Sequence, residues 1–426
     1  MNVLLIGLGG REHAIAWKLK QSHLLTKLFI APGNAGTSGC GINVPIAVDN
    51  FPALAQLVRS EKIKVVVVGP EDPLVKGISD YFKEQDDLRW VAVIGPSAEG
   101  AKLEGSKDFA KKFMGKFNIP TARYRTFALD KGDDSIEEAR AFIGSMKPPY
   151  VLKADGLAAG KGVVILNDPD EAIGELREMF AGKFGSAGKK VVIEEFLDGI
   201  ELSVFVLTDG DSWLLLPEAK DYKRIGEGDT GLNTGGMGAV SPVAFANPAF
   251  MEKVKARIIE PTIKGLQVSG IRYQGFIFFG LISVKGEPFV IEYNVRLGDP
   301  ESEVVIPRIK SDLLDLFIAT AAGRLKEKQI EITGDSATTV MLVSGGYPGD
   351  YHKGLPITGL DSDTGGIVFH AGTSFREKQV VTNGGRVLAL TSLDTTWEKA
   401  LKKSYKAAEG ITFEGVYFRR DIGFDL

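Results

Sequence analysis

The sequence predicts a multidomain protein that combines α/β and α+β folds. Short apolar runs alternate with amphipathic stretches over roughly the first hundred residues, which is typical of an open parallel sheet covered by helices. Pairs of apolar runs joined by glycine-rich turns occupy the middle of the chain, and strand-and-turn patterns fill its last part. Because 426 residues are too many for one ordinary core, roughly two to four domains are expected.

The N-terminal domain is expected at residues 1–104, as an open parallel α/β sheet. Four apolar runs, at 3–7, 28–31, 64–70 and 90–96, alternate with helical patterns. In such a sheet the loops that follow the strands gather at the strands' carboxyl ends, where ligands bind. A ligand site at this rim is therefore expected.

A central domain is expected at residues 105–325, with a small α+β lid inserted at about 122–192. The lid contains a glycine-rich hairpin. The larger unit resumes with the segment at 201–224, which is followed by a long glycine-rich loop, a helix and a hairpin at 276–296. Short strands and turns then dominate from 326 to 426, which predicts a β-rich C-terminal domain.

Composition excludes several classes of function. The net charge is −4 and both signs are interspersed, so no basic stripe predicts a nucleic-acid or membrane partner. No uncharged apolar run approaches the roughly 20 residues that span a bilayer, and the N-terminal apolar run is interpreted as a first strand and not as a targeting segment. The single Cys40 fits a reducing compartment. We expect a cytoplasmic protein that binds small molecules.

The stretch "VLKADGLAAGKGVVIL", at 151–166, predicts a phosphate-binding hairpin. It differs from the P-loop pattern, because three residues separate Gly156 from Gly160 and a glycine follows Lys161. A β-branched run comes next, so a strand follows the glycines in place of a helix. Backbone amides, Lys153 on the incoming strand and Lys161 at the tip could cover a nucleotide triphosphate. The alternative is a surface hairpin with solvated lysines.

The strand that begins "VVIEE" predicts a nucleotide-binding segment. Backbone groups of Glu194, Glu195, Phe196 and Leu197 can hydrogen-bond an adenine edge where the strand ends, and Glu201 can hold ribose hydroxyls. This assignment depends on the preceding hairpin covering the phosphates of the same nucleotide.

The strand "FVIEYNVR" predicts a metal site. Its period of two places Glu292, Asn294 and Arg296 on one face, with Tyr293 and Val295 on the other. Carboxylate and amide oxygens suit Mg²⁺, and an arginine fork can grip a substrate carboxylate. The alternative is a solvated sheet face.

Three loops at the N-terminal rim together predict a sugar-phosphate site. "GLGGREH" opens a helix whose backbone amides attract anions, "APGNAGTSG" offers turn amides, and "VVGPEDPLVKG" offers carboxylates for ribose hydroxyls. Each loop alone could be an ordinary turn. The candidate residues are Gly9, Gly10, Arg11, Gly33, Asn34, Gly36, Thr37, Glu71 and Asp72.

A nicotinamide dinucleotide is disfavoured at this rim. Gly7, Gly9 and Glu12 do not complete G-x-G-x-x-G, and no acidic residue lies between Glu12 and Asp49 to hold a nicotinamide ribose.

The glycine-rich loop at 221–242 is expected near the phosphates, with Lys223 and Arg224 as cations. His13 and His370 could act as general bases. Without a Ser or Cys partner in a nucleophile motif, they are interpreted as binding or structural residues.

The chain resembles the phosphoribosylamine-glycine ligase (glycinamide ribonucleotide synthetase) family nearly from end to end. The resemblance implies a central ATP-grasp fold and a reaction in de novo purine (IMP) biosynthesis. In that reaction ATP drives ligation of glycine to 5-phosphoribosylamine through glycyl phosphate, releasing ADP and phosphate. The motifs are "LIGLGGREHAIAWKL", "GNAGT", "VVGPEDPLVKG", "GPSAEGAKLEGSKDFAKKFM", "VLKADGLAAGKGVVI", "EEFLDG", "GDTGLNTGGMGAVSP", "NVRLGDPESEVVIPR", "GYPGDYHKG" and "TNGGRVLA".

The resemblance also implies residue roles. Mg²⁺ (or Mn²⁺) would be held by Glu292 and Asn294, and the triphosphate by Lys107 and Lys153. Adenine would lie at 194–197. The ribose of ATP would be held by Glu201, phosphoribosylamine by the rim loops, and glycine near Arg296 and Asp299. Arg296, Lys223 and Asp299 are the expected catalytic residues. The expected partners are ATP, glycine and phosphoribosylamine, without nucleic acid or membrane, and the expected state is a monomer or weak homodimer.

Two positions depart from related patterns. The family usually has His where this chain has Tyr222, and many ATP-grasp proteins have an acidic metal ligand where it has Gly280. With Gly280 at the second position, one metal could be held by fewer protein ligands. The ligase family itself tends to have glycine there, so this difference separates it from its wider relatives and does not weaken the resemblance. The alternatives to this function are another ATP-grasp ligase or carboxylase, and an ATP sensor without turnover.

Overall fold

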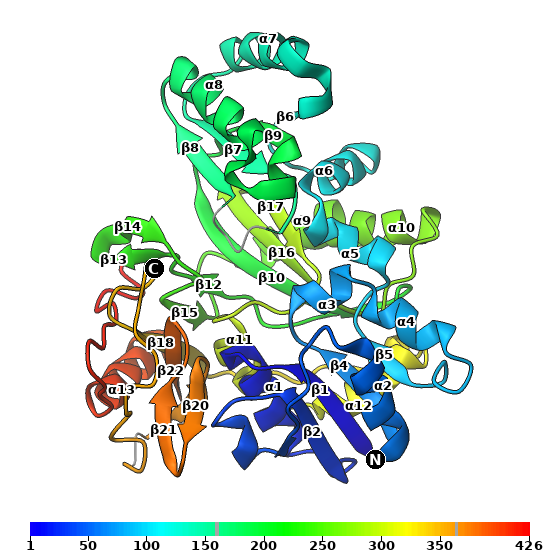
Figure 1. Cartoon of the computed structure of the whole chain (residues 1–426), viewed down its shortest axis with the longest axis vertical. Coiled ribbons are helices and arrows are strands. Elements are labelled where there is room, and N and C mark those ends of the chain that lie inside the picture. Colours follow the sequence, from blue (N-terminus) through cyan, green and yellow to red (C-terminus); the bar gives the residue numbers. More distant parts are fainter. Residues whose placement is uncertain (158–161, 363–364) are drawn as a thin grey trace.

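The computed structural model describes residues 1–157, 162–362 and 365–426. Its N-terminal part is a five-stranded sheet in the order β3-β2-β1-β4-β5, and every pairing in it is parallel. The expected open parallel α/β sheet is thus confirmed (Figure 1). Its strands are β1 (Asn2–Gly7), β2 (Lys27–Pro32), β3 (Ile42–Asn43), β4 (Ile63–Val68) and β5 (Ala92–Ile94), and its helices are α1 (Gly10–Leu19), α2 (Phe51–Ser60), α3 (Glu71–Val75) and α4 (Ile78–Glu84).

The central part is built on an antiparallel sheet in the order β11-β10-β16-β17. A bulge near Ile291 in the last strand lets Val290, Tyr293 and Val295 all reach the same core, although strict alternation would separate Val290 from Tyr293. The strands are β10 (Ile200–Thr208), β11 (Trp213–Leu215), β16 (Gly275–Val284) and β17 (Glu287–Asn294). The helices are α5 (Ala98–Gly105), α6 (Lys107–Lys116), α9 (Pro248–Val254), α10 (Glu260–Val268), α11 (Ser302–Arg308) and α12 (Leu313–Ala321).

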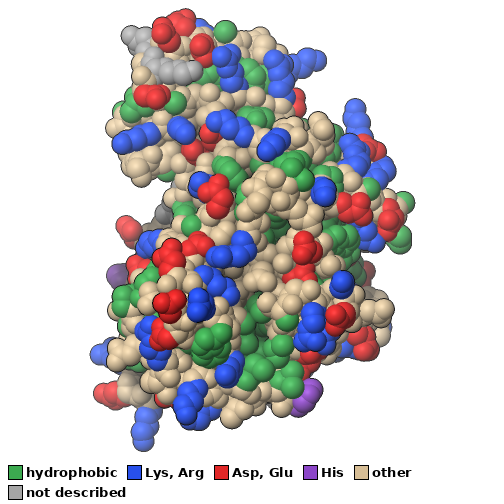
Figure 2. All heavy atoms as spheres, turned by 90° about the vertical axis from the view of Figure 1, so that its right-hand side faces the viewer, with side chains coloured by type: hydrophobic (Ala, Val, Ile, Leu, Met, Phe, Trp, Pro, Cys, Tyr) green, Lys and Arg blue, Asp and Glu red, His purple; other side chains and the backbone are tan. Residues whose placement is uncertain are grey.

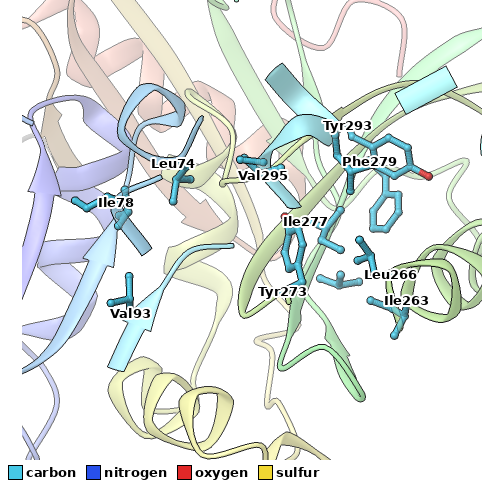
Figure 3. Close-up of a cluster of buried hydrophobic side chains, with 14 of the residues drawn as sticks. Leu74, Ile78, Val93, Ile263, Leu266, Tyr273, Ile277, Phe279, Tyr293 and Val295 are labelled. Atoms are coloured by element: carbon cyan, nitrogen blue, oxygen red, sulfur yellow. The ribbon is translucent and has the colours of Figure 1, made fainter. Parts of the chain in front are cut away.

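One hydrophobic core runs from the N-terminal sheet into the central sheet. Leu74, Ile78 and Val93 of the first part belong to the same buried cluster as Phe279 and Tyr293 of the second (Figure 3). Because burial of apolar side chains is the main favourable contribution to folding, this shared core fixes the rim of the first sheet against the loop that follows β17.

The lid is a four-stranded sheet in the order β6-β9-β7-β8, with helices α7 and α8 packed on it. It has its own core, which includes Phe127, Leu152 and Ile193, and Figure 2 shows it as a separate lobe. Strands β7 and β8 pair antiparallel, so the described ends of the predicted glycine hairpin are flanked by two strands as expected. The elements are β6 (Tyr124–Ala128), α7 (Gly132–Gly144), β7 (Tyr150–Ala154), β8 (Val163–Leu166), α8 (Pro169–Glu178) and β9 (Lys190–Glu195).

The C-terminal sheet has the order β12-β15-β18-β22-β19, which differs in one respect from the expectation of a domain made only of residues beyond 325. Strands β12 and β15 lie at the start and the end of the glycine-rich segment at 220–242. They belong to the C-terminal sheet because β15 pairs with β18. Helix α13 covers this sheet and was not expected from the sequence. The strands are β12 (Lys220–Asp221), β15 (Gly238–Ser241), β18 (Ser336–Val343), β19 (Ile367–His370) and β22 (Arg386–Asp394). Beside them lie the hairpins β13 (Arg224–Gly226) with β14 (Thr230–Asn233) and β20 (Thr373–Arg376) with β21 (Gln379–Thr382), and α13 (Trp397–Glu409).

The surface carries both charge signs without segregation on the face that Figure 2 shows, in keeping with the small net charge. Within the described ranges, no helix combines the length and the apolar character that crossing a bilayer requires.

The β13–β14 hairpin is fastened to the C-terminal segment by Arg419. This side chain is fully buried and lies 2.7 Å from both Asp229 and Asp421. We expect Arg419→Met to lower the free energy of unfolding by about 2–3 kcal/mol, less than for a fully buried pair because Asp229 is partly exposed. Urea denaturation measures this. Arg420→Met is the matched control, because Arg420 is exposed and pairs with Glu409 at the surface; an equal loss in both variants would contradict the role of Arg419.

Candidate active site

Lys107 is positioned by the start of α6. The Ser106 side chain caps this helix, and the Lys107 Nζ donates a hydrogen bond to the Gly156 carbonyl of the glycine hairpin over 2.9 Å. Burial lowers the pKa of Lys107, Glu292 opposes this shift, and the positive charge of Lys153 adds to it. Glu292 and Lys153 therefore both lie within electrostatic reach of Lys107.

Lys153 joins the lid to the central sheet. It projects from β7, its Nζ lies 3.1 Å from Glu194 Oε2 on β9, and it donates to the Ile291 carbonyl on β17 over 3.2 Å. Lys111 Nζ lies 3.0 Å from the same carboxylate oxygen. Burial lowers the pKa of Lys111 to about 8, against the effect of Glu194. Two buried lysines thus share one carboxylate beside the predicted triphosphate site.

The glycine hairpin is described only in part. Gly156 has a φ of 153°, and a Cβ on it would lie 2.9 Å from the Cβ of Ala187, so a side chain is disfavoured there. Gly160 and Lys161, which were predicted to cover the phosphates, lie outside the described residues.

The predicted adenine segment leaves β9 where the lid meets the central sheet. Glu195 Oε1 accepts the Arg123 N–H over 2.8 Å, which ties the strand end to the lid. Phe196 is exposed, and Leu197 is half-buried. Both lysines contact Oε2 of Glu194, whereas its buried Oε1 has no hydrogen-bond partner in the described residues. Glu194 is itself paired with Tyr124 of β6 and Val151 of β7, so the unpaired part of the predicted adenine segment begins after β9.

Glu201 and Lys223 form an ion pair of 2.6 Å, which brings the glycine-rich loop to the start of β10. Burial alone would lower the pKa of Lys223, but the negative charges of Asp221 and Glu201 raise it well above its ordinary value, and Glu292 contributes to the same shift. Lys223 is therefore a fixed positive charge between the predicted ribose and metal residues.

The predicted metal residues lie near the end of β17, after the bulge. Glu292 is exposed and Asn294 is buried. The described residues include no hydrogen-bond or ion-pair partner for either side chain, and no group of three or more His, Cys, Asp or Glu side chains suited to a metal. These two oxygen donors fit an ion such as Mg²⁺ that keeps several waters and shares phosphate oxygens.

Arg296 is held by carboxylates of the N-terminal and central parts. Its guanidinium lies 3.0 Å from Glu104 Oε1 and 3.3 Å from Glu71 Oε2. Burial raises the pKa of Glu104, whereas Arg296 and Arg11 hold the pKa of Glu71 below its ordinary value against burial. The fork predicted for a substrate carboxylate is therefore filled by these two residues, and Glu104 was not identified from the sequence.

Asp299 connects three regions of the chain. Its Oδ2 accepts the Arg11 N–H at the start of α1 over 3.2 Å, and its Oδ1 lies 2.9 Å from the Arg386 guanidinium of β22. Arg386 also donates to the main-chain oxygens of Asp299, over 2.6 Å, and Gly235. Burial alone would raise the pKa of Asp299, but the positive charges of Arg386 and Arg11 lower it below its ordinary value, so Asp299 stays ionised.

The rim loops hold one another together. The Asn34 side chain donates to the carbonyls of Leu8 and His370, at 2.8 and 2.7 Å, and accepts from the amides of Gly36 and Thr37. Gly33 has a φ of 73°, in the left-handed region. The Asn34 amide and the loop glycines thus shape the rim, while the Thr37 hydroxyl is used internally.

The polar side chains at the rim are only partly available to a ligand. Glu12 accepts the Gly9 N–H over 2.6 Å and pairs with the Arg11 guanidinium at 2.7 Å, so the Arg11 side chain is used within the protein. Asp72 is at the surface and pairs with Lys76 at 2.8 Å. Glu71, by contrast, is joined to the central site through Arg296.

His13 and His370 pack together at this rim. His13 Nδ1 accepts the His370 N–H over 2.8 Å, and burial lowers the pKa of His13 to about 3 and that of His370 to about 4. Both are neutral near pH 7, which fits the structural or binding role expected of them better than proton transfer.

Family models match almost the whole chain. They are described as the phosphoribosylglycinamide synthetase N domain, at residues 1–104, the ATP-grasp (A) domain, at 105–302, and the C domain, at 337–425. The phosphoribosylamine-glycine ligase of Chlorobaculum tepidum is 46% identical over 99% of both chains.

This chain belongs to the phosphoribosylglycinamide synthetase family.

Solved structures agree with this membership. The crystal structure of the phosphoribosylamine-glycine ligase of Thermotoga maritima matches with a TM-score of 0.86 and 37% identity, over 99% of this chain and all of that one. The biotin carboxylase domain of the Hydrogenobacter thermophilus 2-oxoglutarate carboxylase, in complex with MgADP and bicarbonate, matches with a TM-score of 0.74 at 19% identity and shows the fold alone. The expected ATP-grasp fold of the central domain is confirmed.

Tyr222, at the position where the synthetase family was expected to have His, is directed away from the site. Its side chain is buried, and its hydroxyl donates to Asp425 Oδ1 near the C-terminus over 3.0 Å. In this member of the family the position fastens the C-terminal segment, and the neighbouring Lys223 is the residue that faces the site.

Three site residues of this synthetase family member were not identified from the sequence. Lys111 lies four residues after Lys107 in α6, so the helical spacing could have placed both on one face. Glu104 and Arg386 gave no such signal, because their partners Arg296 and Asp299 are distant in the chain.

Proposed function

We propose that this chain uses ATP to join glycine to 5-phosphoribosylamine, giving glycinamide ribonucleotide, ADP and phosphate in purine biosynthesis. The single observation that carries the proposal is the 46% identity to a phosphoribosylamine-glycine ligase over 99% of both chains. Support from the site comes from three lysines: Lys107 and Lys223 lie within electrostatic reach of the Glu292 carboxylate, and Lys153 lies within reach of Lys107, as the negative charge of a triphosphate requires.

A glycyl phosphate intermediate would overcome the poor reactivity of a carboxylate. A glycine carboxylate oxygen attacks the γ-phosphorus of ATP and ADP leaves. The amine then attacks the acyl carbon, inorganic phosphate departs, and the nitrogen loses a proton. Lys107 and Lys153 would neutralise the charge that shifts during the first step, and alignment would supply much of the rest.

Glu292 and Asn294 would hold Mg²⁺, or Mn²⁺ in its place. The bound ion would draw charge from the phosphate oxygens during transfer. Two oxygen donors without other recorded partners in the described ranges support this assignment, and the absence of an acidic residue at Gly280 fits an ion with few protein ligands.

We assign the remaining roles by position. Adenine would contact residues 194–197, the ribose of ATP Glu201, and phosphoribosylamine the rim residues of 1–104. Glycine would lie near Arg296 and Asp299, with Lys223 beside the reacting phosphate. To admit a substrate carboxylate, Arg296 would exchange its contact with Glu71, the longer of its two ion pairs.

The domain limits we propose are 1–104, 105–325 and 326–426. Closing of the lid at about 122–192 would exclude water from the acyl phosphate, which hydrolyses readily. The separate core of the lid supports its movement as one body. We also infer a cytoplasmic enzyme that works as a monomer or weak homodimer, which sedimentation over a range of concentrations would test.

The test is ADP formation when phosphoribosylamine is generated in the same vessel. We expect ADP only when ATP, Mg²⁺, glycine and the amine are all present, with each omission as a control. ADP formed with a different acceptor would identify another ATP-grasp ligase or carboxylase. ATP binding without ADP under any combination would indicate a sensor and contradict the proposal.

A further inference from the structure

Glu303 is a buried acid that the proposed mechanism does not use. It lies in α11, its side chain is fully buried, and neither carboxyl oxygen has a hydrogen-bond partner in the described ranges. Its Oε1 is directed at the first residue of α1, since a Cβ on Gly10 would lie only 2.1 Å from it. The carboxyl group therefore sits directly behind the loop predicted to bind an anionic substrate.

The charged groups around Glu303 do not compensate a negative charge there. Helix α11 packs against α1, β15, β18 and β22. It meets Gly10 in α1, and β15 and β18 contain no titratable side chain, so Arg386 of β22 is the nearby cation. Arg386 is occupied by Asp299 and the Gly235 carbonyl, and Asp299 adds a negative charge beside Glu303. Glu301 adds part of a charge only near neutral pH, because burial raises its pKa to about 7.

We propose that Glu303 is a positioning residue that works as a neutral carboxylic acid and keeps the start of α1 and Asp299 free of an additional negative charge where an anionic substrate binds. An ionised carboxylate without hydrogen bonds in a buried position is strongly unfavourable, and protonation removes the charge. The effect on substrate rests on the proposed function, whereas the protonation state does not.

The pKa of Glu303 is raised well above its ordinary value, by burial first and then by the negative charge of Asp299, whereas the positive charge of Arg386 opposes the shift. A carboxyl group whose pKa is higher in the folded than in the unfolded protein stabilises the fold while it is protonated. This stabilisation is complete below the unfolded-state pKa of about 4.5 and is lost as the pH rises toward the folded-state pKa. Glu303→Gln, which cannot ionise, removes this loss.

The first measurement is the unfolding equilibrium of the full-length chain from pH 5 to pH 8.5. For each pH unit, we expect the unfolding constant of the unmodified protein to rise by up to roughly tenfold relative to that of Glu303→Gln, so the variant becomes the relatively more stable protein as the pH rises. Glu331→Gln is the control, because Glu331 is 70% exposed and pairs with Lys310; its difference should stay flat. A flat or falling difference for Glu303→Gln would show an ionised Glu303 and overturn the proposal.

A second measurement does not depend on the variant's stability. The infrared spectrum near pH 7.5 should contain a carbonyl band of a protonated carboxylic acid that is missing from Glu303→Gln. An identical band in both proteins would overturn the proposal.

The kinetic measurement tests positioning. Over the pH range in which the unfolding difference between the two proteins levels off, which marks ionisation of Glu303 in the folded state, the KM for phosphoribosylamine of the unmodified enzyme should rise relative to that of Glu303→Gln by roughly fivefold or more, while the ratio of kcat values changes little. Parallel KM profiles would overturn the positioning role. If the unmodified enzyme forms no ADP at any pH, the proposed function fails, and the unfolding and infrared measurements still decide the protonation state.

Discussion

Glu292→Ala is expected to lower kcat for ADP formation by roughly 10²–10³-fold while the protein stays folded. Glu292 is an exposed carboxylate within electrostatic reach of Lys107 and Lys223, and it is one of two oxygen donors proposed for Mg²⁺. Its loss leaves three lysine charges without the ion that would align the phosphates. Raising the Mg²⁺ concentration should restore part of the activity. Steady-state kinetics at several Mg²⁺ concentrations measure both effects.

The matched control lies on the same strand. Glu287 begins β17 and pairs at the surface with Lys253 and Arg257. Glu287→Ala should keep kcat within a few-fold, because exposed ion pairs contribute little. Near-normal turnover of Glu292→Ala at low Mg²⁺ would remove this strand from the proposed metal site.

Lys153→Met is expected to lower kcat/KM for ATP by roughly 100-fold or more. The variant removes a buried positive charge and leaves Glu194 paired with Lys111 alone. It also breaks the contact between the lid and the Ile291 carbonyl, so both ATP affinity and lid closure should suffer. ATP titrations by calorimetry and single-turnover kinetics would separate the two losses.

Lys189→Met is the control for this change, because Lys189 is an exposed lysine of the same lid. Its kinetics should match those of the unmodified protein. If Lys153→Met binds ATP normally and closes normally, Lys153 is only a structural partner of Glu194. Thermal unfolding of each variant shows whether lost activity reflects lost folding.

Local patterns were sufficient to predict the parallel sheet and the glycine hairpin. Apolar runs separated by helical patterns correctly predicted β1, β2, β4 and β5, and the β-branched run after the hairpin glycines correctly predicted β8. These signals are local because each element's periodicity lies within its own residues. The metal strand was predicted in the same way, although the bulge at Ile291 that sets its register has no signature in the pattern.

Contacts between distant segments could not be predicted from spacing. Arg296 pairs with Glu71 and Glu104, some 200 residues away in the chain, because a shared core holds the two sheets together. Arg386 reaches Asp299 from the C-terminal sheet for the same reason. Propensity and motif describe what a segment can form, whereas these ion pairs depend on how whole sheets pack.

The pairing of β15 with β18 has a consequence for how this enzyme could be divided. A gene cut at residue 326 would separate β18 from two of the strands in its sheet and would expose an unsatisfied row of main-chain amides on each fragment. The last hundred or so residues therefore do not form a complete sheet without residues from the central part of the chain. Any natural shuffling or engineered transplant of this terminal region would have to carry residues 220–241 with it.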